Sequence, residues 1–352
     1  MLSILKKTSF LVLVCQCLII TACKQQAEVP VGDIFGMEVD FDLGDSTFMG
    51  QINDLDKNEG KYYLIDNRSQ IFVLDSNFNL ISARNLSGRG PGEVGRGAAI
   101  RAVDQGLIVF DSESLKFVKF DDSLKMLREF KASDLFPHLG FSFVVEGSEI
   151  YTADNSTQSL ISVFNMDLEE FAGTENSQTV EGIEMDLTFF KDSKRSQARD
   201  NLYHMLRHEE NLVLVNRWNP ANLVLANRNG TYEKAYQYQY EDVDFFKQII
   251  ESNREFHERD ENASSWKTLV RDSVIYNSTL LLLIANEESG RRHILILDLE
   301  GESIRPKKIY QLALESGEIP WVRNIVMDKD GNLLAVSSDH TGFIRYELNL
   351  NE

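Results

Sequence analysis

A repeated strand–turn–strand pattern constrains the fold of this chain more than any other feature of its sequence. The clearest copy spans residues 322–346 and reads VRNIVMDKDGNLLAVSSDHTGFIRY. Asp328, Asp330 and Gly331 lie between two apolar runs, and these residue types tolerate the backbone of a tight hairpin turn. The pattern predicts a hairpin, then a polar gap and a third strand.

The same pattern recurs along the chain. Matches to the hairpin lie at residues 49–66, 97–111, 141–154, 203–217, 273–286 and 322–338. A third strand follows each match, at residues 70–75, 116–121, 160–165, 222–227, 293–298 and 342–347. Outer strands are expected at places such as residues 80–84, 126–130 and 308–312. The first repeats are about 45 residues apart, which favours an all-β, six-bladed β-propeller over a parallel solenoid with about 20 to 30 residues per turn.

The last repeat has no outer strand of its own, because the sequence ends at Glu352. Residues 35–43 (FGMEVDFDL) alternate like a strand and precede the first repeat. We therefore predict that this N-terminal strand closes the last blade, since that pairing removes an exposed sheet edge.

Two insertions lengthen the later repeats. Residues 173–201 are polar and predict a surface excursion with a short helix. Residues 242–271 carry four apolar side chains at helical spacing between positions 245 and 250, which predicts an amphipathic helix. Such a helix either packs against the propeller or presents an apolar patch to a partner protein.

The N-terminal residues predict an export signal. Lys6 and Lys7 precede an apolar run over residues 10–20, which is too short for a stable membrane span. Ala22 and Cys23 then complete the sequence ITAC, which resembles a bacterial lipobox. The resemblance implies that Cys23 is lipidated, and the alternative is an ordinary secretory signal with a chance cysteine. The expected parts are a lipoprotein signal peptide (1–22), a tether (23–33) and the propeller (34–352).

A lipid on Cys23 would hold the protein to a membrane of the cell envelope. Lys24 in the next position is compatible with passage to the outer membrane, and we expect that membrane rather than the inner one, with the body facing the periplasm or the cell surface. Cys15 and Cys17 leave with the signal, so no disulfide is expected. The formal charge of −19 becomes about −21 in the mature chain, which disfavours nucleic acid as a partner.

The most distinctive loop spans residues 88–97 and reads GRGPGEVGRG. Its five glycines and one proline permit turns that present Arg89, Glu93 and Arg96 at defined angles. The loop lacks the order of a phosphate-binding loop. Either it is a tight crossover in which Arg89 pairs with Glu93, or Arg89, Glu93 and Arg96 form a ligand-binding surface.

Residues 88–93 (GRGPGE), the lipobox and the six degenerate repeats together resemble the bacterial six-bladed, TolB-like propeller lipoproteins. The resemblance implies an envelope protein of propeller fold. That family is largely uncharacterised, so no catalytic residue is carried over to this chain.

Other polar residues give no enzymatic motif. His204 and His208 are expected on a strand, where positions four apart lie about 13 Å from each other and cannot share one metal ion. Asp328 and Asp330 lack the remaining ligands of a calcium loop. There is no G-x-S-x-G sequence, and no metal or cofactor is expected. Acidic residues end the second strands of the first three repeats, and we expect them to cap strands and accept backbone hydrogen bonds between blades rather than face a ligand: Asp66, Asp111 and Asp154.

These observations predict a binding or scaffolding module and not an enzyme, with a small ligand or an envelope protein as partner. Three tryptophans in loops or insertions either pack or stack on a sugar: Trp218, Trp266 and Trp321. The alternatives are a hydrolase or lactonase with an acidic or metal-binding site at the channel mouth, and a subunit of an envelope complex. An inward cluster of Asp, Glu or His would favour the enzyme.

Overall fold

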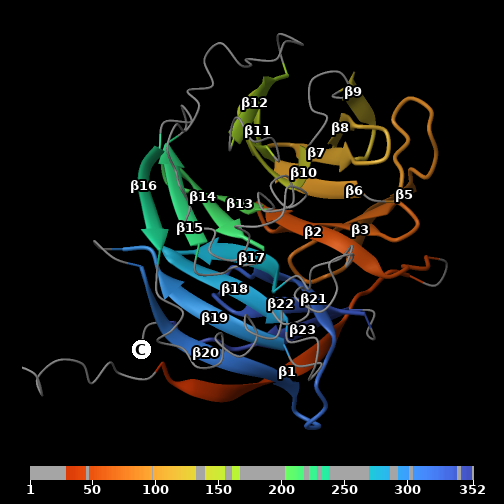
Figure 1. Cartoon of the computed structure of the whole chain (residues 1–352). Coiled ribbons are helices and arrows are strands. Elements are labelled where there is room, and N and C mark those ends of the chain that lie inside the picture. Colours follow the sequence, from red (N-terminus) through yellow and green to blue (C-terminus); the bar gives the residue numbers. More distant parts are fainter. Residues whose placement is uncertain are drawn as a thin grey trace, which may run out of the picture.

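The computed structural model describes residues 29–44, 47–96, 98–131, 139–154, 161–166, 203–217, 222–227, 232–237, 269–285, 292–300, 304–338 and 342–350. These residues form β-strands that are joined by turns and loops (Figure 1). Cys23, the predicted signal peptide and most of the two predicted insertions lie outside them.

Most strands belong to small antiparallel sheets whose order follows the sequence. The first sheet contains β2 (Ile52–Asn58), β3 (Lys61–Asp66), β4 (Gln70–Leu74) and β5 (Leu80–Asn85). The next contains β6 (Ala98–Val103), β7 (Gly106–Asp111), β8 (Lys116–Asp121) and β9 (Met126–Lys131). Then come β10 (Leu139–Glu146), β11 (Glu149–Asp154) and β12 (Ile161–Asn165), followed by β13 (Tyr203–His208), β14 (Asn211–Asn216), β15 (Asn222–Asn227) and β16 (Tyr232–Gln237).

The N-terminal strand joins the remaining strands into one eight-stranded sheet. One half of this sheet contains β17 (Val270–Tyr276), β18 (Thr279–Ala285), β19 (Arg292–Asp298) and β20 (Arg305–Leu314). The other half contains β21 (Val322–Met327), β22 (Leu333–Ser337) and β23 (Gly342–Tyr346). Between them lies β1 (Val31–Asp40), next to the C-terminal strands in Figure 1.

The register of β1 confirms the predicted pairing with the last strand of the chain. Met37 lies opposite Arg345 and Asp40 opposite Gly342, in antiparallel register. The strand starts earlier than predicted, and its first half pairs in parallel with β20, from Val31 opposite Ile309 onward. It therefore covers two sheet edges instead of one.

The repeated apolar runs form strands because both faces of the middle strands are buried. All six residues of β7 and all seven of β18 are buried, whereas the outer strand β5 is half-buried to exposed. The hairpin turn before β22 is fixed as its sequence predicts, since Asp328 Oδ1 accepts hydrogen bonds from the amides of Asp330 (2.8 Å) and Asn332 (2.9 Å). Outer strand β16 was not predicted, and β17 begins inside the predicted second insertion.

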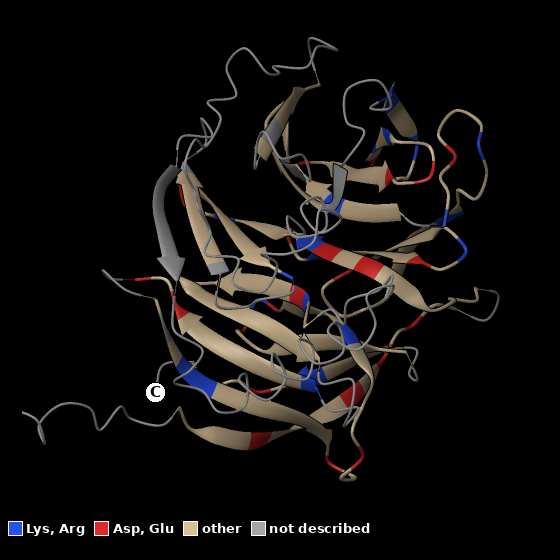
Figure 2. Cartoon of the chain, in the orientation of Figure 1, with Lys and Arg blue, Asp and Glu red and all other residues tan. Residues whose placement is uncertain are grey.

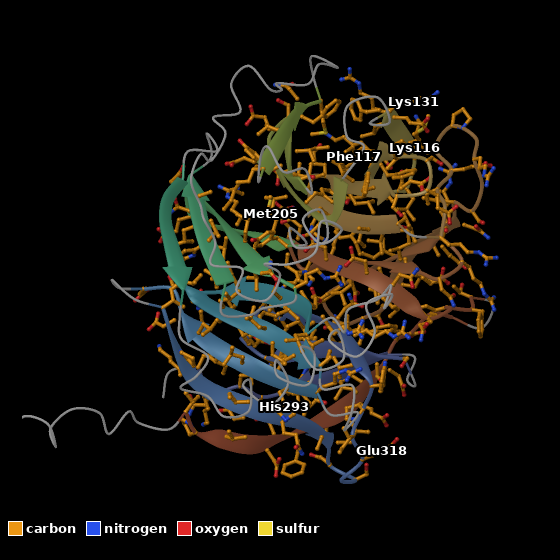
Figure 3. The ribbon with its side chains drawn as sticks, in the orientation of Figure 1. Lys116, Phe117, Lys131, Met205, His293 and Glu318 are labelled. Carbon is orange, nitrogen blue, oxygen red and sulfur yellow. The ribbon has the colours of Figure 1, made fainter. Side chains whose placement is uncertain are left out.

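Apolar side chains fill the spaces between neighbouring sheets (Figure 3). Ile65 and Val73 of the first sheet pack with Leu107 and Val109 of the second, and similar clusters continue along the series. Phe343, in the last strand, packs with side chains of the first sheet, such as Phe72. Burying each such side chain contributes about 1.5 to 3 kcal/mol, so these interfaces are the main source of stability.

The first strand of each sheet lies nearest the centre. β2 contacts β6, and the contacts continue through β10, β13, β17 and β21 back to β2. Figure 1 shows the sheets arranged around this centre. This is the architecture of a β-propeller, in which radially arranged sheets enclose a central channel. In the described part of the chain, no helix has the length and hydropathy needed to cross a bilayer.

Candidate functional site

A central cavity of about 380 Å³ lies where the first strands meet. This volume is in the range of small-molecule sites. Side chains from every sheet line it, together with Arg217, which directly follows β14: Asn53, Asp54, Ala98, Ala99, Arg101, Ser142, Tyr203, His204, Arg217, Arg271, Asp272, Arg323 and Asn324.

Bulges in three of the first strands bring additional polar side chains to this cavity. The register shifts between Ile52 and Asp54 in β2, and between equivalent residues in β17 and β21. Each bulge inserts one extra residue, which is Asn53, Arg271 or Arg323. A bulge re-aims side chains that a regular strand would direct into the sheet interfaces. Adjacent polar residues can therefore both line the cavity.

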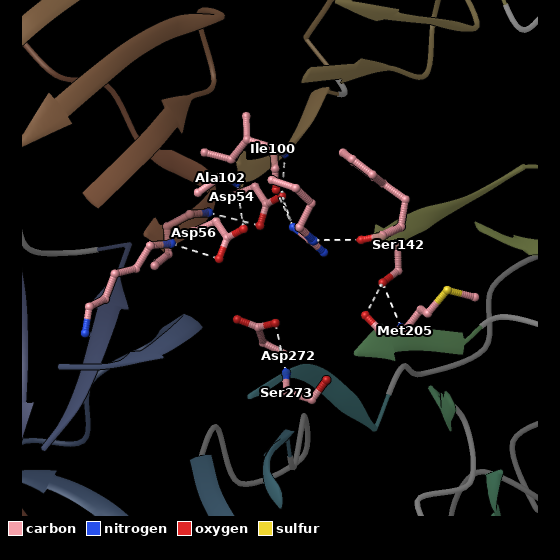
Figure 4. A network of polar contacts seen from close by, with 12 residues as sticks. Asp54, Asp56, Ile100, Ala102, Ser142, Met205, Asp272 and Ser273 are labelled. Carbon is pink, nitrogen blue, oxygen red and sulfur yellow. Dashed lines mark hydrogen bonds and ion pairs between the residues drawn. The ribbon is translucent and has the colours of Figure 1, made fainter. Parts of the chain in front are cut away.

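Carboxylates and a hydroxyl in the cavity wall connect neighbouring sheets (Figure 4). Asp54 Oδ2 accepts a hydrogen bond of 2.8 Å from the Ile100 amide of the next sheet. Asp272 Oδ2 accepts one of 2.8 Å from the Ile325 amide of the next sheet. Ser142 Oγ accepts one of 2.8 Å from the amide of Met205, which lies near the middle of the molecule in Figure 3. These bonds hold the first strands in register.

Two donors continue the connections between sheets. Arg101 Nε donates to the Phe143 carbonyl at 2.9 Å, and Arg101 Nη1 forms an ion pair of 3.2 Å with Asp54 Oδ2. His204 Nε2 lies 3.3 Å from the Val270 carbonyl. Part of the polar wall is therefore structural, because each of these side chains joins two sheets.

Burial shifts the protonation of several cavity groups. It raises the pKa of Asp272 to about 7, and the nearby Asp54 adds to this effect. It also raises the pKa of Asp54, although the Arg101 guanidinium opposes that shift. Burial lowers the pKa of His204 well below its ordinary value, and the charge of Arg217 lowers it further. His204 is therefore neutral near pH 7, and the positive charge of the cavity comes from arginine.

The structure places Arg89, Glu93 and Arg96 in the exposed loop between β5 and β6, and none of them lines the central cavity. Glu93 Oε2 accepts a hydrogen bond of 2.6 Å from the Gly90 amide in the same loop. The Arg96 carbonyl accepts one of 3.0 Å from Asn53 Nδ2, so the backbone of this loop contacts the cavity wall.

We call residues 86–96 the crossover loop. Its backbone is fastened to the second sheet: the Gly92 amide donates to Glu129 Oε2 at 2.8 Å, and Lys116 Nζ donates to the Gly90 carbonyl at 3.1 Å. Lys116 also forms an ion pair of 3.0 Å with Glu129. Gly92 has a φ of 70°, and an added Cβ would lie 2.8 Å from Met126 Sδ. Glycine is therefore favoured at this position by its conformation, and a larger residue would also displace the Met126 side chain.

Two of the three strand-ending aspartates act as caps, as predicted. Asp66 and Asp111 are fully buried. Asp66 accepts from the Gly50 amide at 2.8 Å, and Asp111 from the Gly95 amide at 3.0 Å. The donors lie in the segment that enters the same sheet, which corrects the expectation of bonds between blades. The side chain of Asp154 lies outside the described residues.

His204 and His208 both lie on β13, as predicted, and only His204 faces the cavity. Among the described side chains, no group of three or more His, Cys, Asp or Glu is placed to hold a metal ion. Trp321 packs under Arg292, whose guanidinium carbon is 4.0 Å from the ring centroid. Trp218 and Trp266 lie outside the described part of the chain.

Apart from His204, which the sequence analysis considered only as a metal ligand, the cavity residues were not singled out from the sequence, although a signal for most of them was present. Five of the six predicted first strands contain a polar residue that lines the cavity, and Asp272 directly precedes the sixth: Asp54, Arg101, Ser142, His204 and Asn324. An alignment of the repeats on their first strands, instead of on their turns, would have placed these polar residues at equivalent positions.

Comparisons with known proteins identify no family for this chain. No protein-family model matches it, and no curated protein matches its sequence. Among solved structures, a structural genomics protein of unknown function from Bacteroides thetaiotaomicron has a TM-score of 0.50 at 8% identity, covering 91% of this chain and 74% of the other. BamB from Moraxella catarrhalis has a TM-score of 0.42 at 9% identity, covering 91% and 98%. Glutaminyl cyclase from Myxococcus xanthus has a TM-score of 0.41 at 8% identity, covering 90% and 97%. At these identities, the likeness to the first of these structures concerns the fold alone.

Proposed function

We propose that this chain is a lipid-anchored, six-bladed β-propeller of the cell envelope that binds a ligand in its central cavity. The observation that carries the proposal is the cavity itself, which is of small-molecule size and has a polar wall with side chains from every sheet. A rigid framework of this kind presents fixed polar groups to a ligand at low entropic cost.

The count of six blades is supported by the first strands and by the division of the largest sheet. Strands β2, β6, β10, β13, β17 and β21 each begin one four-stranded or three-stranded unit. The eight-stranded sheet divides at β1 into the fifth and sixth units. In this assignment β1 is the outer strand of the sixth blade, and its parallel pairing with β20 is an additional contact with the fifth blade.

The anchor is proposed from the sequence of the signal segment and from the position of β1. Cys23 precedes Val31, the first residue of β1, by eight positions, so a lipid there would hold the propeller close to the bilayer. We expect wild-type protein in the outer-membrane fraction and Cys23→Ala protein in the soluble fraction. Membrane attachment of the Cys23→Ala variant would contradict the anchor.

Ligand binding is tested by blocking the cavity. Asn53→Trp places a bulky ring in the cavity wall, and Asn85→Trp places the same ring on exposed outer strand β5. The mature protein is screened in detergent against a library of neutral, cationic and anionic small molecules by thermal shift. We expect ligands that stabilise the wild type and Asn85→Trp but not Asn53→Trp. Stabilisation of all three proteins to the same extent would exclude the cavity as the site.

Pull-down from native membranes tests the scaffolding form of the proposal. Recovery of one stoichiometric envelope protein, unaffected by Asn53→Trp, would favour a scaffold over a small-molecule site. Turnover of a library member, lost in the same variant, would favour the hydrolase or lactonase.

A further inference from the structure

The central cavity has an excess of positive charge in a strongly acidic chain. Among the described residues, four arginines and two carboxylates line it: Arg101, Arg217, Arg271 and Arg323 against Asp54 and Asp272. The whole chain has a formal charge of −19. A concave site with a sign opposite to the rest of the molecule attracts ligands that the outer surface repels.

Arg101 and Arg323 each donate hydrogen bonds to known acceptors. Arg101 is bound to Asp54 and to the carbonyls of Ile100 and Phe143. Arg323 is exposed and donates to Gln51 Oε1 at 3.0 Å. Neither is the main candidate to receive a ligand.

Arg217 differs from these two. Its carbonyl accepts hydrogen bonds of 3.0 Å from the amides of Leu269 and Val270, which fixes the backbone at the cavity wall. Its Nε is buried and has no hydrogen-bond acceptor among the described residues. The pKa of Arg217 is lowered by burial and by the neighbouring charge of Arg271, and Asp272 only partly opposes this. A buried N–H without an acceptor costs free energy, which an acceptor on a ligand would offset.

Asn324 provides a second unsatisfied group in the same wall. Its Oδ1 is buried, and no donor reaches it from the part of the chain that the structure describes. A ligand that satisfies both groups carries an oxyanion for the guanidinium and a hydroxyl or amide N–H for Asn324. A cavity of about 380 Å³ limits such a ligand to a small molecule.

We propose that the central cavity binds a small organic oxyanion with a hydroxyl or amide donor, that Arg217 binds its anionic group beside Arg271, and that Asn324 accepts from its donor. This inference rests on the proposed function of the cavity as a ligand site. The planar guanidinium fork suits carboxylate, sulfate and phosphate alike, so the shared chemistry is the oxyanion.

The inference is tested by calorimetry on the mature protein in detergent. The probes are inorganic phosphate, glycolate, malate, citrate and D-glucuronate, with D-glucose and D-glucosamine as neutral and cationic counterparts of the last. We expect at least one oxyanion to bind, with Arg217→Met weakening it about tenfold or more. Arg217→Lys should weaken it less, because the charge remains although the fork is lost. Arg89→Met, which removes an exposed arginine of the crossover loop, should have no effect.

Asn324→Asp is a second variant that does not depend on how Arg217→Met folds. It keeps the size of the side chain and adds a negative charge, so it should weaken the same oxyanion. Binding that is equal in wild type, Arg217→Met and Asn324→Asp would overturn the inference. So would binding lost in Arg89→Met alone, or no binding by any oxyanion. If neutral or cationic molecules bind in the cavity instead, the inference fails and the proposed function stands.

Discussion

The crossover loop and the central cavity both contain arginines and carboxylates, but the charged groups of the two regions are stabilised in different ways. In the loop, the arginine side chains are exposed, and the buried Lys116 of the neighbouring strand β8 lies against Glu129 and the Gly90 carbonyl. Among the described residues of the cavity, arginines outnumber carboxylates, and Arg217 has a buried Nε without an acceptor. Exposed charge is solvated by water, whereas buried charge needs a partner in the protein or a ligand. The comparison places the candidate ligand site in the cavity.

The largest expected effect comes from breaking the ion pair in the cavity wall. Asp54→Ala removes the acceptor of the Ile100 amide and leaves the half-buried Arg101 guanidinium without its carboxylate. We expect the free energy of unfolding to fall by about 3 kcal/mol, measured by urea denaturation. A loss below about 1 kcal/mol would show that the ion pair in the cavity wall contributes as little to stability as the exposed charges of the loop.

The double variant Asp54→Leu/Arg101→Met is the control for this experiment. It removes both charges of this ion pair together, so neither of its members is left without the other. We expect it to be more stable than Asp54→Ala, because an apolar pair often replaces a buried ion pair at little cost.

A smaller effect is expected where the crossover loop enters its sheet. Asp111→Ala removes the acceptor of the Gly95, Glu113 and Ser114 amides. We expect a loss of about 2 kcal/mol in the free energy of unfolding, since water reaches some of these amides. The matched exposed variant is Asp75→Ala, whose turn lies outside the loop. Equal losses in both variants would contradict a special role of Asp111 in fastening the loop.

The third prediction concerns pH. The pKa of Asp272 is raised from an ordinary value near 3.8 to about 7, so the folded state binds more protons than the unfolded state between these values. The contribution of Asp272 to the free energy of unfolding is therefore fully present below pH 4 and is lost as the pH rises toward 7.

Asp272→Asn isolates this contribution. Between pH 5 and pH 7, we expect the decline in the free energy of unfolding to be smaller in the variant by about 1 kcal/mol or more. The raised pKa of Asp54 acts in the same direction, so part of the decline remains. An identical pH dependence in wild type and variant would place Asp272 in contact with bulk water.

The smallest effect is expected from the loop arginine. Arg89 is exposed, and no hydrogen bond of its side chain is seen among the described residues. Arg89→Ala should change the free energy of unfolding by less than about 0.5 kcal/mol. A larger loss would mean that the loop depends on this side chain and not only on its backbone contacts.

Much of the fold was predictable because each repeat can be recognised from its local sequence pattern. The inner strands were predicted from apolar runs that are separated by turns containing Asp and Gly. The pairing of β1 with β23 was predicted because the strand that begins near Phe35 precedes the first repeat and belongs to no repeat of its own. The parallel pairing of β1 with β20 was not predictable, since the register between strands far apart in the sequence produces no local sequence pattern.

The site was harder to predict, because it depends on contacts between repeats. Residues 88–93 were conspicuous because of their glycines, but these glycines allow the backbone conformation of the loop. Arg217 and Asp272 were inconspicuous, because one follows β14 and the other follows a bulge in β17, and only the assembled sheets bring them into one cavity. Expectations for Cys23 and for the helix near residue 245 remain predictions, because both lie outside the described residues.

The position of β1 between β20 and β23 also sets an order of events during synthesis. The ribosome releases β1 first, and its neighbours in the sheet emerge roughly 270 to 310 residues later. At about 5 to 20 residues per second, this strand waits for about 15 to 60 seconds before it can hydrogen-bond. The eight-stranded sheet is therefore completed only when β23 joins β1, and until then the half of β1 from Met37 to Asp40 keeps unpaired backbone groups that chaperones can recognise.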